Sequence, residues 1–121
     1  MRNGLLQVRR WAITGLMSPT IGRLQALERL YMQGYQDEVV DLTLRKLLER
    51  QVQKDATQLA ELHADLVRFE ERYSMTSADF FARYQAGQAG DDMDAFEWNV
   101  TYKMYSHLAE AVDTLRVQLR E

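Results

Sequence analysis

The sequence predicts an all-α protein: a long antiparallel helical hairpin with a coiled-coil-like seam, a short capping helix at its tip and a short N-terminal helix. Two observations predict this fold class. Apolar residues recur at intervals of three and four over most of the chain, which is the period of an amphipathic helix. Proline occurs once in 121 residues, so the breaks that strand-and-turn folds require are scarce.

Residues 1–18 show no sustained periodicity, and we interpret them as a loose N-terminal arm or a mis-called extension. Their apolar stretch is too short and too broken by glycine for a secretory signal. Met17 directly precedes the first helix, so the sequence leaves open whether Met1 or Met17 is the initiator. Residues 19–121 are expected to form a single helical domain.

The first helix is predicted to begin at Thr20 and to end at Gly34, where glycine stops the periodic run. Its apolar residues are Ile21, Leu24, Leu27, Leu30 and Tyr31. The second helix is predicted over residues 38–73 with Asp37 as its N-cap, a rod of roughly 54 Å at 1.5 Å per residue. Its apolar stripe is Val40, Leu44, Leu47, Leu48, Val52, Leu59, Leu62, Leu66, Phe69 and Tyr73.

A short third helix is predicted to start at Ser77, because the Thr76 hydroxyl can accept the amide of Asp79. Met75 and Phe80 are placed to form a hydrophobic staple across this start. Gly87 has the conformational freedom to end the helix. The last helix is predicted over residues 93–119, with an apolar stripe that Met104 and Ala111 widen. The stripe consists of Trp98, Tyr102, Tyr105, Leu108, Val112, Leu115 and Leu119.

Only the short helix and a glycine turn separate the two long helices, so they are expected to lie antiparallel. The second half of the long helix has coiled-coil spacing, and Asp55 interrupts the heptad just before it. The first half has no partner in this arrangement. We therefore expect a homodimer or an obligate partner chain, and the sequence does not say which helix would form a dimer interface.

The residues of known catalytic and metal sites are nearly absent. With no cysteine, two histidines and no glycine-rich phosphate loop, we expect no enzyme, no cofactor and no small-molecule substrate. Glu61 and His63 turn to different faces of a helix, and His107 with Glu110 is a single pair, so no metal site is expected. The lack of cysteine suits a cytoplasmic location, and no apolar run approaches the roughly 20 residues that cross a bilayer.

Charge is distributed unevenly along the chain. Residues 1–34 hold five arginines against one glutamate, a balance of +4, and residues 35–121 hold 10 basic against 17 acidic side chains, or −7. A basic front end favours contact with nucleic acid. The candidate residues are Arg23, Arg29, Arg45 and Lys46, of which the last two follow the turn at Gly34 in a faint helix-turn-helix outline.

The run FEERYSMTSADFFARYQAGQAGDDMDAFEW, with the later YKMYSHL, resembles the antitoxin component of small prokaryotic type II toxin-antitoxin modules, of the kind called TumA. The resemblance covers about residues 20–115. The matching residues are Tyr73, Met75, Thr76, Phe80, Gly87, Gly90, Asp91, Asp92, Phe96, Glu97 and Trp98, and Ser74 stands where the family usually has glycine. The resemblance implies an inhibitor of a ribonuclease-like toxin, TumE, encoded beside it.

An antitoxin of this type would lay an acidic, aromatic surface against a basic RNA-binding cleft. Charge and expected exposure select Phe81, Tyr84, Asp91, Asp92, Asp94, Glu97 and Trp98 as the partner-binding set. For the aromatic members, filling of the core is an equally open interpretation. Two other functions remain: a dimeric DNA-binding regulator of its own operon, and a coiled-coil adaptor without a toxin partner.

Overall fold

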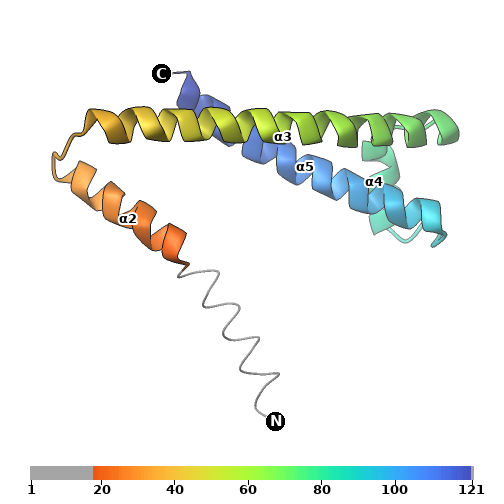
Figure 1. The fold of residues 1–121 in the computed structure, drawn as a ribbon. Coiled ribbons are helices and arrows are strands. Elements are labelled where there is room, and N and C mark those ends of the chain that lie inside the picture. Colours follow the sequence, from red (N-terminus) through yellow and green to blue (C-terminus); the bar gives the residue numbers. More distant parts are fainter. Residues whose placement is uncertain (1–17, 121) are drawn as a thin grey trace, which may run out of the picture. The chain divides into compact units, whose positions relative to one another are not determined.

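The computed structural model describes residues 18–120 and contains four helices, labelled as in Figure 1. They are α2 (Pro19–Met32), α3 (Glu38–Tyr73), α4 (Ser77–Gln85) and α5 (Met93–Leu119). The described residues form no strand, which confirms the predicted all-α class. The predictions for residues 1–17, including the choice of initiator, lie outside the described residues.

Backbone contacts divide the chain into two units, residues 1–40 and 41–121. The first contains α2 and the start of α3. Ser18 caps α2 through its hydroxyl, which accepts the amide of Ile21 at 3.1 Å. Asp37 caps α3 as predicted, because its Oδ1 accepts the amide of Val39 at 2.8 Å. The chain between these helices is fixed by Tyr31, whose hydroxyl donates to the Asp37 carbonyl at 3.0 Å.

In the second unit, α5 returns along α3 in the opposite direction (Figure 1). The contacts between the two helices show this direction, because residues later in α5 contact residues earlier in α3. Phe69 stacks on Trp98, His63 lies against Tyr105 with ring centroids 6.1 Å apart, and the Arg45 guanidinium donates to the Leu119 carbonyl at 3.2 Å. The predicted antiparallel hairpin is therefore present, with both long helices at their predicted bounds.

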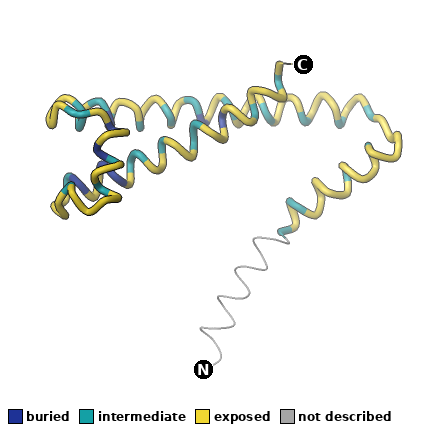
Figure 2. The backbone as a smooth tube through the Cα atoms, turned by 180° about the vertical axis from the view of Figure 1, so that it is seen from behind, coloured by how far each residue is buried: buried dark blue, intermediate teal, exposed yellow. Residues whose placement is uncertain are grey.

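The seam of the hairpin follows the predicted stripes except at five positions. Every seam position on α5 is buried or half-buried, and on the part of α3 in this unit only Leu47 and Tyr73 are exposed. Figure 2 shows buried and half-buried stretches alternating with exposed ones along both long helices. Met104 and Ala111 are exposed, so the prediction that they widen the stripe is wrong. Asp55 lies in the seam, 8% exposed, with its carboxylate accepting from Gln51 Nε2 at 3.0 and 3.1 Å.

The short helix α4 lies at the tip of the hairpin, where α3 and α5 diverge (Figure 1). Its start is the predicted one: the Thr76 hydroxyl accepts the amide of Asp79 at 3.1 Å. Met75 packs on the buried cluster that contains Phe80, in line with the predicted staple. Gly87 has φ +74, the left-handed conformation that glycine adopts at little cost.

Ser74 joins α3 to α4 in a left-handed conformation, with φ +50. A residue with a Cβ is strained there by roughly 1–2 kcal/mol. Glycine adopts this conformation without that strain.

Replacing Ser74 by glycine is expected to raise the free energy of unfolding by about 0.5–1 kcal/mol, because relief of the strain exceeds the extra entropy of glycine in the unfolded chain. Urea unfolding followed by circular dichroism measures the change. Ser74→Ala keeps the Cβ and should give no gain. A loss of stability in Ser74→Gly would show that the turn is not strained.

Candidate functional site

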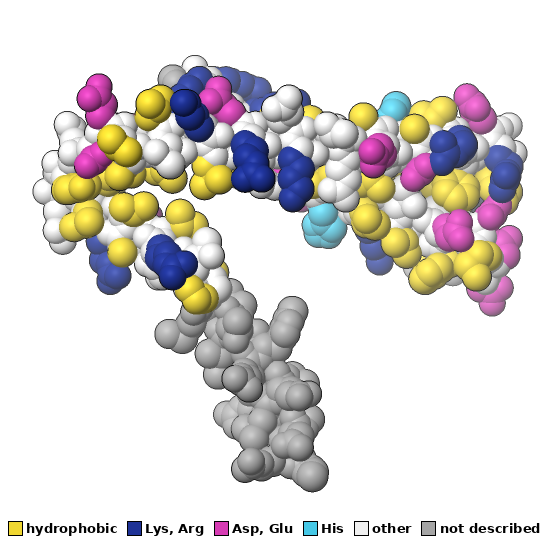
Figure 3. Space-filling model, in the orientation of Figure 1, with side chains coloured by type: hydrophobic (Ala, Val, Ile, Leu, Met, Phe, Trp, Pro, Cys, Tyr) yellow, Lys and Arg dark blue, Asp and Glu magenta, His cyan; other side chains and the backbone are white. Residues whose placement is uncertain are grey.

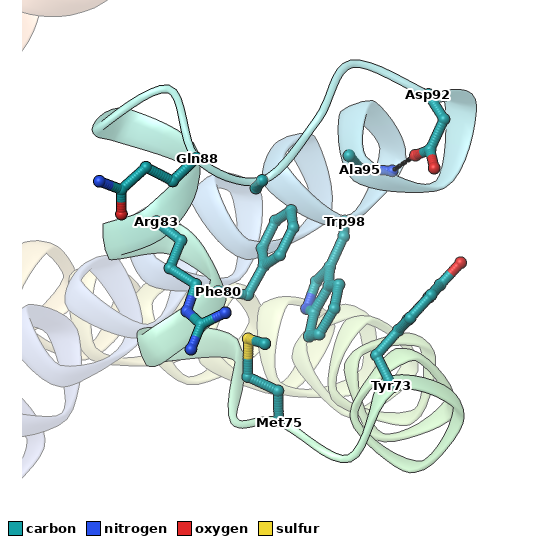
Figure 4. A pocket seen from close by; sticks show the side chains of 9 residues that line it. Tyr73, Met75, Phe80, Arg83, Gln88, Asp92, Ala95 and Trp98 are labelled. Atoms are coloured by element: carbon teal, nitrogen blue, oxygen red, sulfur yellow. Dashed lines mark hydrogen bonds between the residues drawn. The ribbon is translucent and has the colours of Figure 1, made fainter.

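A stack of aromatic rings joins the three helices at the tip, defined here as residues 69–98. Trp98 of α5 is 2% exposed and lies at its centre. The Phe80 ring of α4 stacks on it with centroids 4.0 Å apart, and Phe69 and Tyr73 of α3 stack at 5.5 and 5.6 Å. Figure 4 shows Phe80 on one side of Trp98 and Tyr73 on the other. Each long helix therefore contributes rings to one shared core.

Hydrogen bonds fix the orientation of this stack. The Trp98 indole N–H donates to the Ser77 hydroxyl at 2.9 Å, and this contact is buried. The Ser77 amide in turn donates to the Glu70 carboxylate at 2.8 Å, so a side chain of α3 holds the start of α4. Buried polar groups of the stack thus have partners, as a rigid core requires. The ordered core of the tip therefore holds the residues on its surface in defined positions.

Carboxylates cover the outside of the tip. Residues 69–98 carry seven acidic and two basic side chains, a net charge of −5. Acidic side chains gather at this end of the hairpin in Figure 3. Asp92 caps α5, with Oδ1 accepting the amide of Ala95 at 2.8 Å, while Asp91 and Glu97 are exposed. A field of this sign attracts a basic partner over about a Debye length.

Asp94 forms a latch between α5 and α3. Its Oδ2 accepts hydrogen bonds from the Tyr73 hydroxyl and, at 2.8 Å, from the Arg72 guanidinium. These two hydrogen bonds lower the pKa of Asp94 below its ordinary 3.8. The bond from the Tyr73 hydroxyl has the larger effect, and the bond from Arg72 has the second largest. The bond to Asp94 likewise raises the pKa of Tyr73 above 10. The latch therefore stabilises the fold at pH values between the pKa of Asp94 and the pKa of Tyr73. This stabilisation is lost as pH falls through the Asp94 pKa or rises through the Tyr73 pKa.

The carboxyl carbon of Asp94 is expected to titrate below pH 3.8 in an NMR experiment. In Tyr73→Phe, which removes the larger cause of the shift, the midpoint should move back toward the ordinary value. Tyr84→Phe removes a hydroxyl elsewhere at the tip and should leave the Asp94 midpoint unchanged. Equal midpoints in the wild-type protein and Tyr73→Phe would rule out the latch.

The predicted partner-binding residues fall into three environments. Asp91, Asp92 and Glu97 are exposed. Phe81 and Tyr84 are half-buried, with Phe81 against the Tyr102 ring at 5.1 Å and Tyr84 against Phe80 at 5.7 Å. Asp94 is half-buried in the latch, and Trp98 is in the core. The exposure expected of Trp98 is therefore wrong, because α4 covers the ring that the linear sequence left open.

Sequence reasoning missed a row of exposed apolar side chains on the outer face of α5. Phe96 is 55% exposed, Val100 37% and Met104 46%. Their spacing of four residues places them on one side of the helix, so the signal was present in the sequence. This signal was hard to recognise because Met104 also borders the seam stripe. Only the observed packing distinguishes the exposed face of α5 from its seam face.

The four basic candidates are divided between the two units. Arg23 and Arg29 lie on α2 in the first unit, and Arg45 and Lys46 lie on α3 in the second. Arg45 ties α3 to the end of α5 through the Leu119 carbonyl. Lys46 instead begins an exposed row with Arg50 and Lys54, at intervals of four residues. Figure 3 shows Lys and Arg side chains along this part of α3.

The tip also contains a cavity of about 210 Å³, between Tyr73 and Asp92 on one side and Arg83 on the other (Figure 4). This is smaller than the 300–1,000 Å³ of typical small-molecule sites. In residues 18–120 no three His, Asp or Glu side chains are grouped so as to hold a metal ion. Nor does any helix there combine the length and apolar character needed to cross a bilayer.

Comparisons with models of protein families, with curated proteins and with solved structures gave no match for this chain.

Proposed function

We propose that the protein is a non-enzymatic interaction module of the cytoplasm, and that it acts as an antitoxin against a ribonuclease-like toxin encoded by the adjoining gene. One observation of the structure carries the proposal: exposed carboxylates are held outside a tip whose core is fixed by the Trp98 stack. The resemblance of the same residues to TumA-type antitoxins supports it.

Inhibition would need no chemistry on this chain. A ribonuclease binds the phosphates of its substrate with basic side chains, so an acidic surface can occupy the same cleft and neutralise its charge. Asp91, Asp92 and Glu97 are the exposed carboxylates for this contact. Asp92 is held by its N-cap bond, and Glu97 lies in the first turns of α5, whose backbone is already ordered before binding.

Co-expression with the product of the adjoining gene tests this function. The antitoxin proposal predicts a stable complex, growth rescue of cells that express the neighbour, and inhibition of RNA cleavage by the purified neighbour. A complex without inhibition would instead favour the adaptor function. No complex at all would contradict the proposal.

DNA binding is a second candidate, favoured by the exposed row of Lys46, Arg50 and Lys54 on α3. Four residues of helix rise about 6 Å, a spacing that allows successive side chains to contact successive phosphates. Filter binding of a duplex from the promoter of the operon, repeated over a series of salt concentrations, tests it. Phosphate contacts predict a steep fall in affinity with salt, which the triple exchange of this row for glutamine should flatten.

A homodimer is also proposed, because α2 buries none of its residues within its own unit. Leu24 is 50% exposed and Leu30 43%, and both lie on the apolar face of this helix. A helix with an uncovered apolar face is stabilised when another chain covers it. Light scattering should give a dimeric mass for the full chain and a lower mass for Leu24→Gln with Leu30→Gln.

A further inference from the structure

We infer that the outer face of α5 is a second docking surface, which receives an apolar helix of the protein partner and offers it Asn99 as a hydrogen-bond acceptor. The inference rests on the proposed function, because the same partner is expected to contact the acidic tip. It adds a separate site on that partner, with a different chemistry.

The surface is an open groove of about 640 Å³ that follows about four turns of α5, from Phe96 to Ala111, and is bordered by Gln58 of α3. Its apolar wall is the row of Phe96, Val100 and Met104, all exposed in the free protein. Side chains spaced four residues apart on one helix can pack between the side chains of a second helix. This is the arrangement in helix-in-groove recognition. Large apolar side chains that stay together at the surface commonly mark a contact with another protein.

Asn99 gives an independent indication of an occupant. Its side chain lines the same groove and is 6% exposed, yet its Oδ1 is buried without a hydrogen-bond partner. A buried acceptor without a donor lowers the stability of the free protein, and such groups are rare in native structures. A donor on the docked helix would satisfy it after a small rotation of the amide.

The charges of the groove define the chemistry of the occupant. Its ionisable side chains are Lys103 and His107, and no carboxylate lines it. A docked helix with carboxylates beside its apolar ridge is therefore favoured over a basic one. This distinguishes the groove from the acidic tip, which attracts basic groups.

A second copy of this chain fits the groove less well. Three large side chains offer much less than the roughly 800 Å² per partner that a standard dimer interface buries. Lys103 also lies near the middle of the groove, between Phe96 and Ala111. A two-fold axis there would bring Lys103 of both copies together, and like charges across an interface repel.

Two variants that insert the same carboxylate test the inference, with the purified product of the adjoining gene as the probe. Met104→Glu places a negative charge in the groove, and we expect a loss of affinity of about tenfold or more by calorimetry. Val117→Glu is the matched control, since Val117 is 48% exposed on the same helix and does not line the groove. It should leave affinity within about twofold.

Asn99→Leu provides a second readout. Removing the unpaired amide oxygen should raise the thermal unfolding midpoint of the free protein while weakening the complex, a combination that a merely structural residue does not give. Equal binding by the wild-type protein and Met104→Glu would overturn the inference and leave the proposed function standing. Failure of the wild-type protein to bind the neighbour would overturn both.

Discussion

Replacing Trp98 by alanine is expected to lower the free energy of unfolding by about 3–5 kcal/mol, one of the largest effects of any single substitution in the described chain. The ring is 2% exposed and contacts aromatic rings of both α3 and α4. Its removal leaves a cavity where three helices meet and deprives the Ser77 hydroxyl of its donor. Urea unfolding followed by circular dichroism at 222 nm measures the loss.

Two comparisons isolate the cause. Trp98→Phe keeps an aromatic ring but removes the indole N–H, and should cost less than the alanine variant. Phe96→Ala truncates a ring two residues away that is 55% exposed, and should change stability by about 0.5 kcal/mol or less. Equal losses in Trp98→Ala and Phe96→Ala would contradict the central place of Trp98 in the core.

Reversal of two carboxylates at the tip, Asp91→Lys with Glu97→Lys, is expected to slow association with the product of the adjoining gene by about 10–100-fold at low salt. Both side chains are exposed, so the fold should not change. Because the effect acts through the long-range field, it should shrink as salt is added. Stopped-flow kinetics at several salt concentrations measures it.

The other end of α5 supplies the matched control. Glu110 and Asp113 are also exposed carboxylates, and Glu110→Lys with Asp113→Lys changes the net charge by the same amount. This variant should slow association much less, because its charges lie away from the acidic tip. If both double variants slow association equally, the association rate would depend on the net charge of the protein and not on the carboxylates at the tip.

Local signals made the helices predictable from the sequence. The caps at Asp37 and Thr76 and the glycine stop at Gly87 each depend on residues within a few positions, and all three are present in the structure. The antiparallel hairpin followed from the short connection between α3 and α5. These features require no knowledge of distant contacts.

The environment of the site residues depended on tertiary packing and was less predictable. Whether Trp98 faces the partner or the core is decided by α4, which enters between α3 and α5 and stacks Phe80 on the ring. Met104 is likewise exposed on α5 and not buried in the seam, which the helical period alone did not decide. The helical period of a sequence determines which residues share a face of a long helix. It does not determine which of these faces a short helix such as α4 covers.

The central claim is that the aromatic stack supports the tip from inside, while recognition belongs to its exterior. Acrylamide quenching of tryptophan fluorescence tests this directly in Trp11→Phe, where Trp98 is the one remaining tryptophan. The account predicts blue-shifted emission that acrylamide barely quenches in the free protein. Red-shifted emission that acrylamide quenches readily would show the Trp98 ring exposed to solvent, and would contradict the account.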